Sequence, residues 1–508
     1  MGPILEFELD RKAPLPLCQQ LHQQLREALE GGLFEPGSRL PATRRVATEL
    51  GLHRATVVEA YRRLELEGWV DQRVGSGTYV RSPASAAASA LRGRGGGPVA
   101  VGVAELLEQV RRVELPPVSP DALDLSTIVP DVRGFPSEAF HASLRRASER
   151  RGSEVLSYGP ATGDAELRDL LAERLRRRGL PVEGSDLVVV AGAQQGIDLL
   201  LRAHAQPGDR VVVESPTYHH ALDLLRIHRV EIDELPLHHD RGGSRSHYDS
   251  DELERCLSAR PAVVYAQPNH QNPTGLTLRP ESRVQLVEAC ARAGSLLIED
   301  DYEAELHHDE DGRLKPLAAI SDGAVVAHVG TLSKALFPGL RIGWIAGPSE
   351  LIERVARVKR ITDLSGSVIL QAAAADLIAT GEYDRHLEQV VAEGVRRLKT
   401  LGRALARELP PGFTATAPEG GHALWLELPP GLTGEALARR AAEEGVLVSP
   451  GELFSVRGGP GAVRLSTAQL DAAEIDDAVG RLARAARALM AEGPRPTRDP
   501  DLEAPLRI

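Results

Sequence analysis

The chain has 508 residues, and its 72 acidic side chains exceed its 60 lysines and arginines, which gives a net charge of −12. A chain of this length exceeds what one hydrophobic core usually covers, so we expect two or three domains. The three cysteines, Cys18, Cys256 and Cys290, lack CxxC or metal-ligand spacing, which predicts neither a disulfide framework nor a metal site. No window reaches the roughly 18 to 20 apolar residues of a membrane span. These features predict a soluble, cytoplasmic protein without a membrane partner.

The first 81 residues contain helix signals followed by a hairpin signal. Leucines 17, 21, 25 and 29 form an apolar stripe on one predicted helix that ends at Gly31. Two further helices, in ATRRVATEL and HRATVVEAYRRLELEG, are separated by Gly51, which predicts a helix-turn-helix. WVDQRVGSGTYV then alternates around GSG like a small hairpin, or wing. A helical protein-interaction module is the alternative.

Charge is distributed unevenly along the chain. Residues 1–81 hold eleven basic and eleven acidic side chains, so the remainder carries the whole acidic excess. Within this segment, residues 39–63 contain six arginines against Glu49 and Glu59. A local basic face on an acidic protein is what contact with nucleic-acid phosphates requires.

LPATR, HRATVVEAY and GSGTYV together resemble the GntR superfamily of winged helix-turn-helix regulators, over residues 15–81. The resemblance implies contact with double-stranded DNA, with Arg44, Arg54 and Thr56 at DNA-contacting positions and Gly77 at the tip of the wing. Arg45 and Arg62 are interpreted as solvated charges.

Composition divides the rest of the chain. Residues 82–119 are rich in Ala, Ser, Gly and Pro at both ends with a short helical stretch inside, which predicts a linker spanning on the order of 30 Å. We expect a large domain over 120–490, with a smaller subdomain from about 385 to 490, and a loose tail over 491–508.

Apolar runs alternate with helical patterns in this large domain. The runs are LVVVAG, RVVVES, AVVYAQ, SLLIED, AVVAHV and RIGWIAG, starting at 187, 210, 262, 295, 324 and 341. This alternation predicts an α/β fold whose mostly parallel sheet is covered on both faces, with a small C-terminal α/β subdomain.

Polar residues follow several of these strands. Ala193 and Gln194 would begin a helix, and their backbone N–H groups would face an anion. Tyr218 could place its ring over a planar ligand. The other candidates are Asn272 in NPTG, Asp300 and Tyr302 after a strand, Lys334 in TLSK, and Thr331, Ser333 and Arg341 as a phosphate cup.

Each of these residues has an ordinary explanation when it is considered alone: a strand-end acid, a turn residue or a surface charge. In this order they resemble fold-type I pyridoxal 5'-phosphate (PLP) proteins of the aminotransferase class I and II family, over residues 120–490. The resemblance implies that Lys334 forms a Schiff base with PLP and that Asp300 pairs with the ring nitrogen. It also implies that Tyr158 reaches the phosphate of the neighbouring subunit and that Arg464 holds a carboxylate.

The two halves together resemble the MocR/PdxR-like subgroup of GntR regulators. This implies a head-to-tail homodimer whose PLP domain senses an amino compound, or PLP itself, and alters DNA binding. Two departures stand out: Ile128 lies near a position where catalytic relatives have glycine, and His270 stands where an aromatic is common. Regulation is the preferred hypothesis; an active aminotransferase carrying a DNA-binding domain, and a DNA-binding module with purely structural PLP, are the alternatives.

Overall fold

The chain divides into two compact units, residues 1–109 and 110–508, in a computed structural model. The structure describes residues 7, 9, 17–30, 34, 38–66, 69–73, 77–80, 116, 119, 121–307, 314–321, 326–459 and 461–492. Most of the predicted linker and the predicted tail from 493 onward lie outside the described residues, so those two expectations stay predictions.

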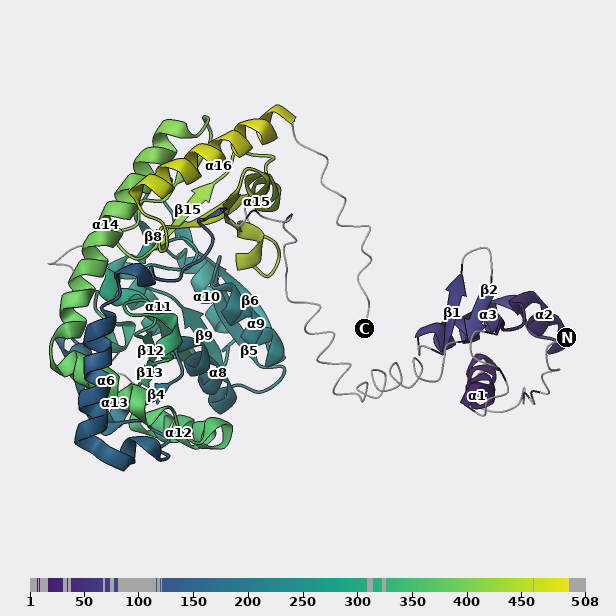
Figure 1. Cartoon of the computed structure of the whole chain (residues 1–508), viewed down its shortest axis with the longest axis horizontal. Coiled ribbons are helices and arrows are strands. Elements are labelled where there is room, and N and C mark those ends of the chain that lie inside the picture. The colour runs from purple at the N-terminus through teal and green to yellow at the C-terminus, as the bar shows by residue number, and fades with distance from the viewer. Residues whose placement is uncertain are drawn as a thin grey trace. The chain divides into compact units, whose positions relative to one another are not determined.

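The first unit is a winged helix, as the sequence predicted. Its elements are α1 (Leu17–Glu30), α2 (Thr43–Glu49), α3 (Arg54–Leu66), β1 (Val70–Arg73) and β2 (Gly77–Val80) (Figure 1). Leu21 and Leu25 of the predicted stripe are fully buried against Val57 and Leu64 of α3. β1 and β2 pair antiparallel, with Val70 opposite Val80. Apolar burial on one side of α1 and α3 therefore holds the unit together.

A seven-stranded sheet forms the centre of the second unit. Its order is β4 (Leu187–Val190), β13 (Gly343–Ala346), β12 (Val326–Thr331), β11 (Leu296–Asp300), β9 (Val263–Ala266), β5 (Arg210–Ser215) and β6 (Glu231–Pro236). Neighbouring strands are parallel except where β13 runs antiparallel to β12 and β4. The mostly parallel sheet is confirmed, and β6 is a strand that the sequence analysis missed. β6 lies at the sheet edge with the sequence EIDELP, in which acidic residues interrupt the apolar ones, so it lacks a continuous apolar run.

Helices cover both faces of this sheet, and alternate strand residues enter two separate cores. Val188 and Val211 pack with α8 (Ala193–His204), α9 (His219–Ile227) and α12 (Ser349–Asp363). Val189 and Val212 point to the other face. There they pack with α7 (Ala165–Arg177), α10 (Ser250–Ser258), α11 (Pro280–Ala293) and α13 (Val368–Ala379). The side-chain period of two thus produces a three-layer α/β/α arrangement.

A second, smaller sheet follows in the chain. It has the antiparallel order β14 (Thr414–Ala415), β15 (Ala423–Glu427), β18 (Ala462–Ser466), β17 (Ser449–Pro450). It packs with α14 (Glu382–Glu408), α15 (Gly434–Glu443) and α16 (Ala472–Glu492). We expected the smaller subdomain at about 385–490, and these elements occupy that range except for the first turn of α14 and the end of α16. β3 (Leu123–Asp124) adds a segment from outside the range by pairing with β16 (Val446–Leu447).

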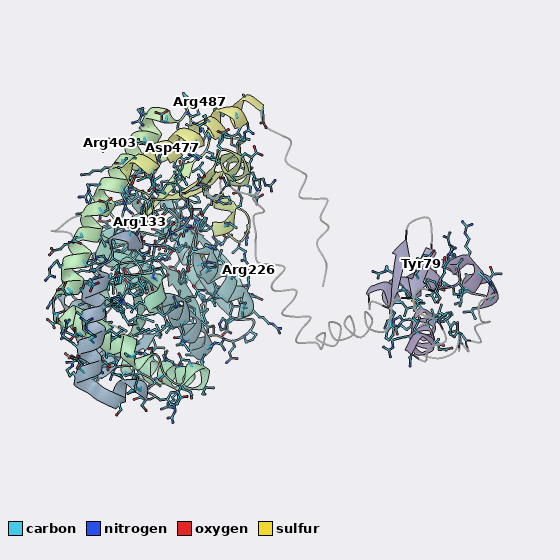
Figure 2. The ribbon with its side chains drawn as sticks, in the orientation of Figure 1. Tyr79, Arg133, Arg226, Arg403, Asp477 and Arg487 are labelled. Carbon is cyan, nitrogen blue, oxygen red and sulfur yellow. The ribbon has the colours of Figure 1, made fainter. Side chains whose placement is uncertain are left out.

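Polar contacts join the segment after β3 to this smaller sheet. Arg133, labelled in Figure 2, donates from its guanidinium to the Gln469 carbonyl at 2.7 Å. Arg397 of α14 pairs with Asp131 at 3.0 Å. Both contacts bridge residues more than 260 positions apart, so only folding brings them together.

The remaining described α-helix, α6 (Ser137–Arg151), packs on α13, and the remaining described strands form a three-stranded sheet of β10 (Thr277–Leu278), β8 (Arg245–His247) and β7 (His238–His239). Among the described helices, none combines the length and apolar character needed to cross a membrane.

Candidate cofactor pocket and nucleic-acid interface

One pocket lies at the carboxyl end of the large sheet, with an empty volume of about 610 Å³. Asp300 ends β11, Thr331 ends β12, and two residues separate the end of β4 from the start of α8. The carboxyl ends of neighbouring parallel strands meet at one edge, where loops can form a binding site. The structure places ten of the predicted residues on the pocket wall: Ala193, Gln194, Tyr218, Asn272, Asp300, Tyr302, Thr331, Ser333, Lys334 and Arg341. Gly192, Gln267 and Pro338 complete the wall and were missed.

The start of α8 forms one end of the pocket. Gly192 precedes the helix with φ 87°, and a Cβ atom added there would lie 3.2 Å from the Arg341 guanidinium. Glycine therefore allows Arg341 to approach the helix N-terminus. Thr331 and Ser333 bring their hydroxyl oxygens within 3.0 Å of each other beside it. Helix N–H groups, two hydroxyls and one guanidinium make a site for a phosphate group.

Asp300 lies on the pocket wall and is 2% exposed. Its Oδ2 accepts hydrogen bonds from Tyr265 Oη at 2.6 Å and from Gln267 Nε2 at 3.0 Å. Its Oδ1 has no hydrogen-bond partner among the described residues. Burial raises the pKa of Asp300 to about 6, against the lowering effect of the two hydrogen bonds. A buried carboxylate oxygen without a donor fits a protonated ring nitrogen, which would supply that donor.

Lys334 is half-buried and reaches the pocket from the turn after β12. Its Nζ donates to the Ile128 carbonyl at 2.6 Å. Burial lowers the pKa of Lys334, while the charge of Glu303 opposes that change. Glu303 is itself buried and accepts a contact from His422 Nδ1 at 2.7 Å. A lysine with a lowered pKa has the free amine that nucleophilic attack on an aldehyde requires.

Ile128, the first departure, contributes its backbone to the site. Its side chain is buried and is absent from the residues that line the pocket, whereas its carbonyl contacts Lys334. The second departure, His270, is fully buried, and its carbonyl accepts from Tyr302 Oη at 2.9 Å.

Arg464 lies on β18 beside this pocket and is 5% exposed. It donates from Nη1 to Asn272 Oδ1 at 2.8 Å and from Nη2 to Ser449 Oγ at 3.1 Å and to the Ser126 carbonyl. Its Nε has no hydrogen-bond partner among the described residues. Burial lowers the pKa of Arg464 to about 10. An arginine with one unused donor in a buried position fits a carboxylate ligand.

Sequence reasoning missed Gln267, Ser126 and Ser449. Gln267 stands five residues before Asn272 in the same strand-end motif, and that proximity was a usable signal. Ser126 and Ser449 lie hundreds of residues from each other and touch through Ser449 Oγ, which donates to the Ser126 carbonyl at 3.0 Å. No spacing in the sequence indicates such a contact.

Tyr158 is not on the wall of this pocket. Its side chain is 81% exposed and lines a separate hollow with Gly366 and Val368. The predicted reach of Tyr158 to a neighbouring subunit therefore stays a prediction.

Asp301, next to Asp300, belongs to a buried charge cluster behind the pocket. Its Oδ2 contacts Arg178 Nη2 at 2.5 Å and His328 Nε2 at 3.0 Å, and its Oδ1 accepts from Asn269 Nδ2 at 2.7 Å. These partners lower the pKa of Asp301, with Arg178 contributing most, against the cost of burial. Two adjacent aspartates on one strand end thus have opposite pKa shifts because their side chains face different surroundings.

In the winged helix, the predicted DNA-contacting arginines are on the surface. Arg44 and Arg54 are exposed and form no ion pair with the described residues. Arg45 instead pairs with Glu49 at 2.6 Å, and Arg62 pairs with Glu59 at 2.8 Å. Arg44 and Arg54, which were predicted to contact phosphates, therefore carry guanidiniums without an ion pair among the described residues, whereas Arg45 and Arg62 do not.

Thr56 is half-buried in the first turn of α3, and Gly77 is the first residue of β2, paired with Arg73. The roles of Thr56 and Gly77 toward DNA stay predictions.

Two family models match the chain, and each falls within one unit. Residues 17–80 match bacterial regulatory proteins of the gntR family, and residues 124–482 match aminotransferase class I and II. A gntR-type DNA-binding domain joined to an aminotransferase domain is the architecture of one group of regulators. The chain is a MocR-type transcriptional regulator of the GntR family.

This regulator is similar to curated relatives along most of its length. It is 32% identical to the uncharacterized HTH-type transcriptional regulator YdcR of Escherichia coli, over 86% of this chain and 92% of the relative. It is 31% identical to the probable rhizopine catabolism regulatory protein MocR of Rhizobium meliloti, over 96% and 97%.

Among solved structures, the regulator is similar to LysN, an alpha-aminoadipate aminotransferase from Thermus thermophilus, captured with N-(5'-phosphopyridoxyl)-L-leucine. The identity is 30%, the TM-score is 0.69, and the match covers 79% of this chain and 99% of LysN. The fold of the large domain and these neighbours imply dependence on PLP.

Proposed function

We propose that this regulator binds PLP in the pocket at the end of the large sheet, senses an amino compound or PLP itself there, and changes its grip on an operator as a homodimer. The observation that carries the proposal is Asp300 Oδ1, which is buried on the pocket wall without a donor. In a pocket that also holds Lys334 and a phosphate-type cup, a pyridine ring with a protonated nitrogen would satisfy that oxygen.

The wall residues have complementary roles in this proposal. Asp300 would hold the proton on the ring nitrogen, Lys334 would bind the aldehyde carbon, and Tyr218 would cover one face of the ring. The N-terminus of α8, with Ser333 and Arg341, would bind the phosphate. PLP, when bound, supplies an electron-withdrawing ring that acidifies the carbon next to an attached amine. Lys334, whose pKa is lowered by burial, can then accept or return a proton at Nζ.

Arg464 indicates the class of effector. Its unused Nε donor and its buried position favour a ligand that carries a carboxylate as well as an amine. Such a ligand would compete for Arg464 with the Ser126 carbonyl and Ser449, which hold the segment after β3. Binding of an amino acid would therefore change the contacts of a segment that lies shortly after the linker in the sequence.

The homodimer has support in exposed apolar side chains of the second unit. Leu156 and Tyr158 are 80% and 81% exposed, and Ile361 at the end of α12 is 87% exposed. The hollow beside Tyr158 is also lined by Gly366, Val368 and Gln371, so residues 157–160 lie next to residues 366–371. Large apolar side chains this exposed are typical of a surface that another protein copy covers.

The test uses full-length protein with PLP. Absorbance of lysine-bound PLP is recorded before and after a panel of amino acids is added. Binding to a duplex selected from a random library is then measured with and without the amino acid that changes the spectrum. A coupling of about 1–3 kcal/mol, or roughly 5- to 150-fold in DNA affinity, is expected. An unchanged affinity with PLP and with every amine would refute sensing, even if DNA binding itself is tight.

An active aminotransferase is the second candidate, favoured because Lys334, Asp300 and Arg464 are brought together as one site. Sustained formation of a keto acid from an amino donor would establish it, and a single half-turnover would not. Purely structural PLP is the third: if Lys334→Ala removes the PLP absorbance yet leaves regulation intact, that hypothesis holds.

A further inference from the structure

The apolar residues on the outer face of α3 carry an inference about which base the protein contacts. The rotation of α3 is set by Val57, Ala60, Tyr61 and Leu64, which are at most 1% exposed in the core of the winged helix. Tyr61 also donates from its hydroxyl to the Pro41 carbonyl at 2.9 Å, which fixes the helix to the segment just before α2. Residues 54, 55, 58 and 62 therefore face outward, at the helical spacing of a single stripe.

This outward stripe carries two apolar side chains between two arginines. Arg54 has no ion-pair partner among the described residues, whereas Arg62 pairs with Glu59 at 2.8 Å, a carboxylate that also pairs with Arg63 at 3.2 Å. Between them lie Ala55, which is exposed, and Val58, which is 41% exposed. Val58 stands four residues from each arginine, so its isopropyl group projects from the middle of a face that carries a free positive charge at its N-terminal end.

The start of α3 is held in a defined geometry. The backbone N–H of Ala55 donates to His53 Nδ1 at 3.3 Å, so His53 occupies one of the otherwise unpaired N–H groups of the first turn. The helix itself sets the positions of Arg54 and Val58 relative to each other.

We propose that Val58, flanked by Ala55, reads a thymine through its 5-methyl group in the major groove. The inference rests on the proposed function, in which α3 is the element that enters the groove. The charge of this face identifies DNA as its partner. Exposed Arg44 and Arg54 lack ion-pair partners among the described residues, and their positive charge complements the negative phosphates of DNA. In the major groove, thymine offers the only methyl group among the four base edges, and an aliphatic side chain is the matching contact.

The experiment is a methyl scan of the operator. Full-length protein with PLP selects its site from a random duplex library, and each thymine of the selected half-site is then replaced singly by deoxyuridine, which lacks the methyl group. Equilibrium affinities are measured at one salt concentration for the wild type, for Val58→Ala, and for Val284→Ala. Val284 is a matched control, since it is a valine on a helix with 45% exposure in the other unit.

We expect one thymine at which deoxyuridine weakens wild-type binding about fourfold, the value of one buried methyl group. Val58→Ala removes the contact from both protomers of the proposed homodimer, so it should weaken binding to the thymine site by at least that factor, and it should lose discrimination between thymine and deoxyuridine at that position. Val284→Ala should keep both the wild-type affinity and the wild-type discrimination between thymine and deoxyuridine.

Two results would overturn the proposal: no thymine with a methyl effect in the wild type, or unchanged discrimination in Val58→Ala. Selection of no specific site at all is a different result, because it would contradict DNA reading by the winged helix as a whole.

Discussion

Adjacent Asp300 and Asp301 allow a matched test of the cofactor pocket. Burial raises the pKa of Asp300 from its ordinary value of 3.8 to about 6, which corresponds to a cost of about 3 kcal/mol for holding the ionised carboxylate in the folded protein. Because the folded pKa is the higher one, this cost is fully present above pH 6 and disappears as the pH falls below 3.8. Asp301 has the opposite shift, so its contribution stabilises the fold above its ordinary pKa of 3.8 and is lost as the pH falls.

We compare Asp300→Asn with Asp301→Asn at pH 8, where both carboxyls of the wild type are ionised. Asp300→Asn removes the burial cost of about 3 kcal/mol but adds an amide donor that needs a partner, a penalty of about 1–3 kcal/mol. The free energy of unfolding of the PLP-free protein should therefore stay equal or rise. Asp301→Asn leaves the Arg178 charge buried without its anion, which should destabilise the fold by about 3–5 kcal/mol.

The two variants should affect PLP affinity in the reverse order, so that Asp300→Asn has the larger effect. Asp300→Asn removes a charge-assisted hydrogen bond of about 1.5–3 kcal/mol to the ring nitrogen, so PLP should bind roughly ten- to a hundredfold more weakly. Urea unfolding of the PLP-free protein measures the first quantity, and an absorbance titration with PLP under folding conditions measures the second. The assignment of Asp300 to the ring nitrogen is refuted if Asp300→Asn binds PLP as the wild type does, and the difference between the two aspartates is refuted if Asp300→Asn loses as much stability as Asp301→Asn.

Three further outcomes are expected. Lys334→Ala should abolish the absorbance of lysine-bound PLP, and a band that persists would place the covalent attachment elsewhere. Arg464→Lys should keep that absorbance but weaken binding of a carboxylate-bearing amine about tenfold or more, because the planar fork of donors is lost; an equal response to carboxylate-free amines in wild type and variant is the control. Arg54→Ala should reduce the salt dependence of DNA binding, measured as the slope of log affinity against log salt concentration, by about one. Arg45→Ala should change it little, since Glu49 already neutralises that arginine; equal slopes for the two variants would contradict this assignment.

The sequence by itself determined much of the pocket wall, because strand-end motifs must meet when parallel strands lie side by side. Asp300, Thr331 and the start of α8 follow apolar runs, so their positions at one edge of the sheet could be predicted. The buried leucines of α1 were equally predictable, since helical spacing dictates which residues share a face.

Only the tertiary structure decided how these residues are surrounded. Nothing in the string EDDY indicates that Asp300 faces the pocket with an unpartnered oxygen while Asp301 faces Arg178 and His328. Ser126 and Ser449 meet Arg464 from distant parts of the chain. Burial and long-range hydrogen bonds set the pKa values and the unused donors, and both depend on contacts between residues that local sequence spacing does not relate.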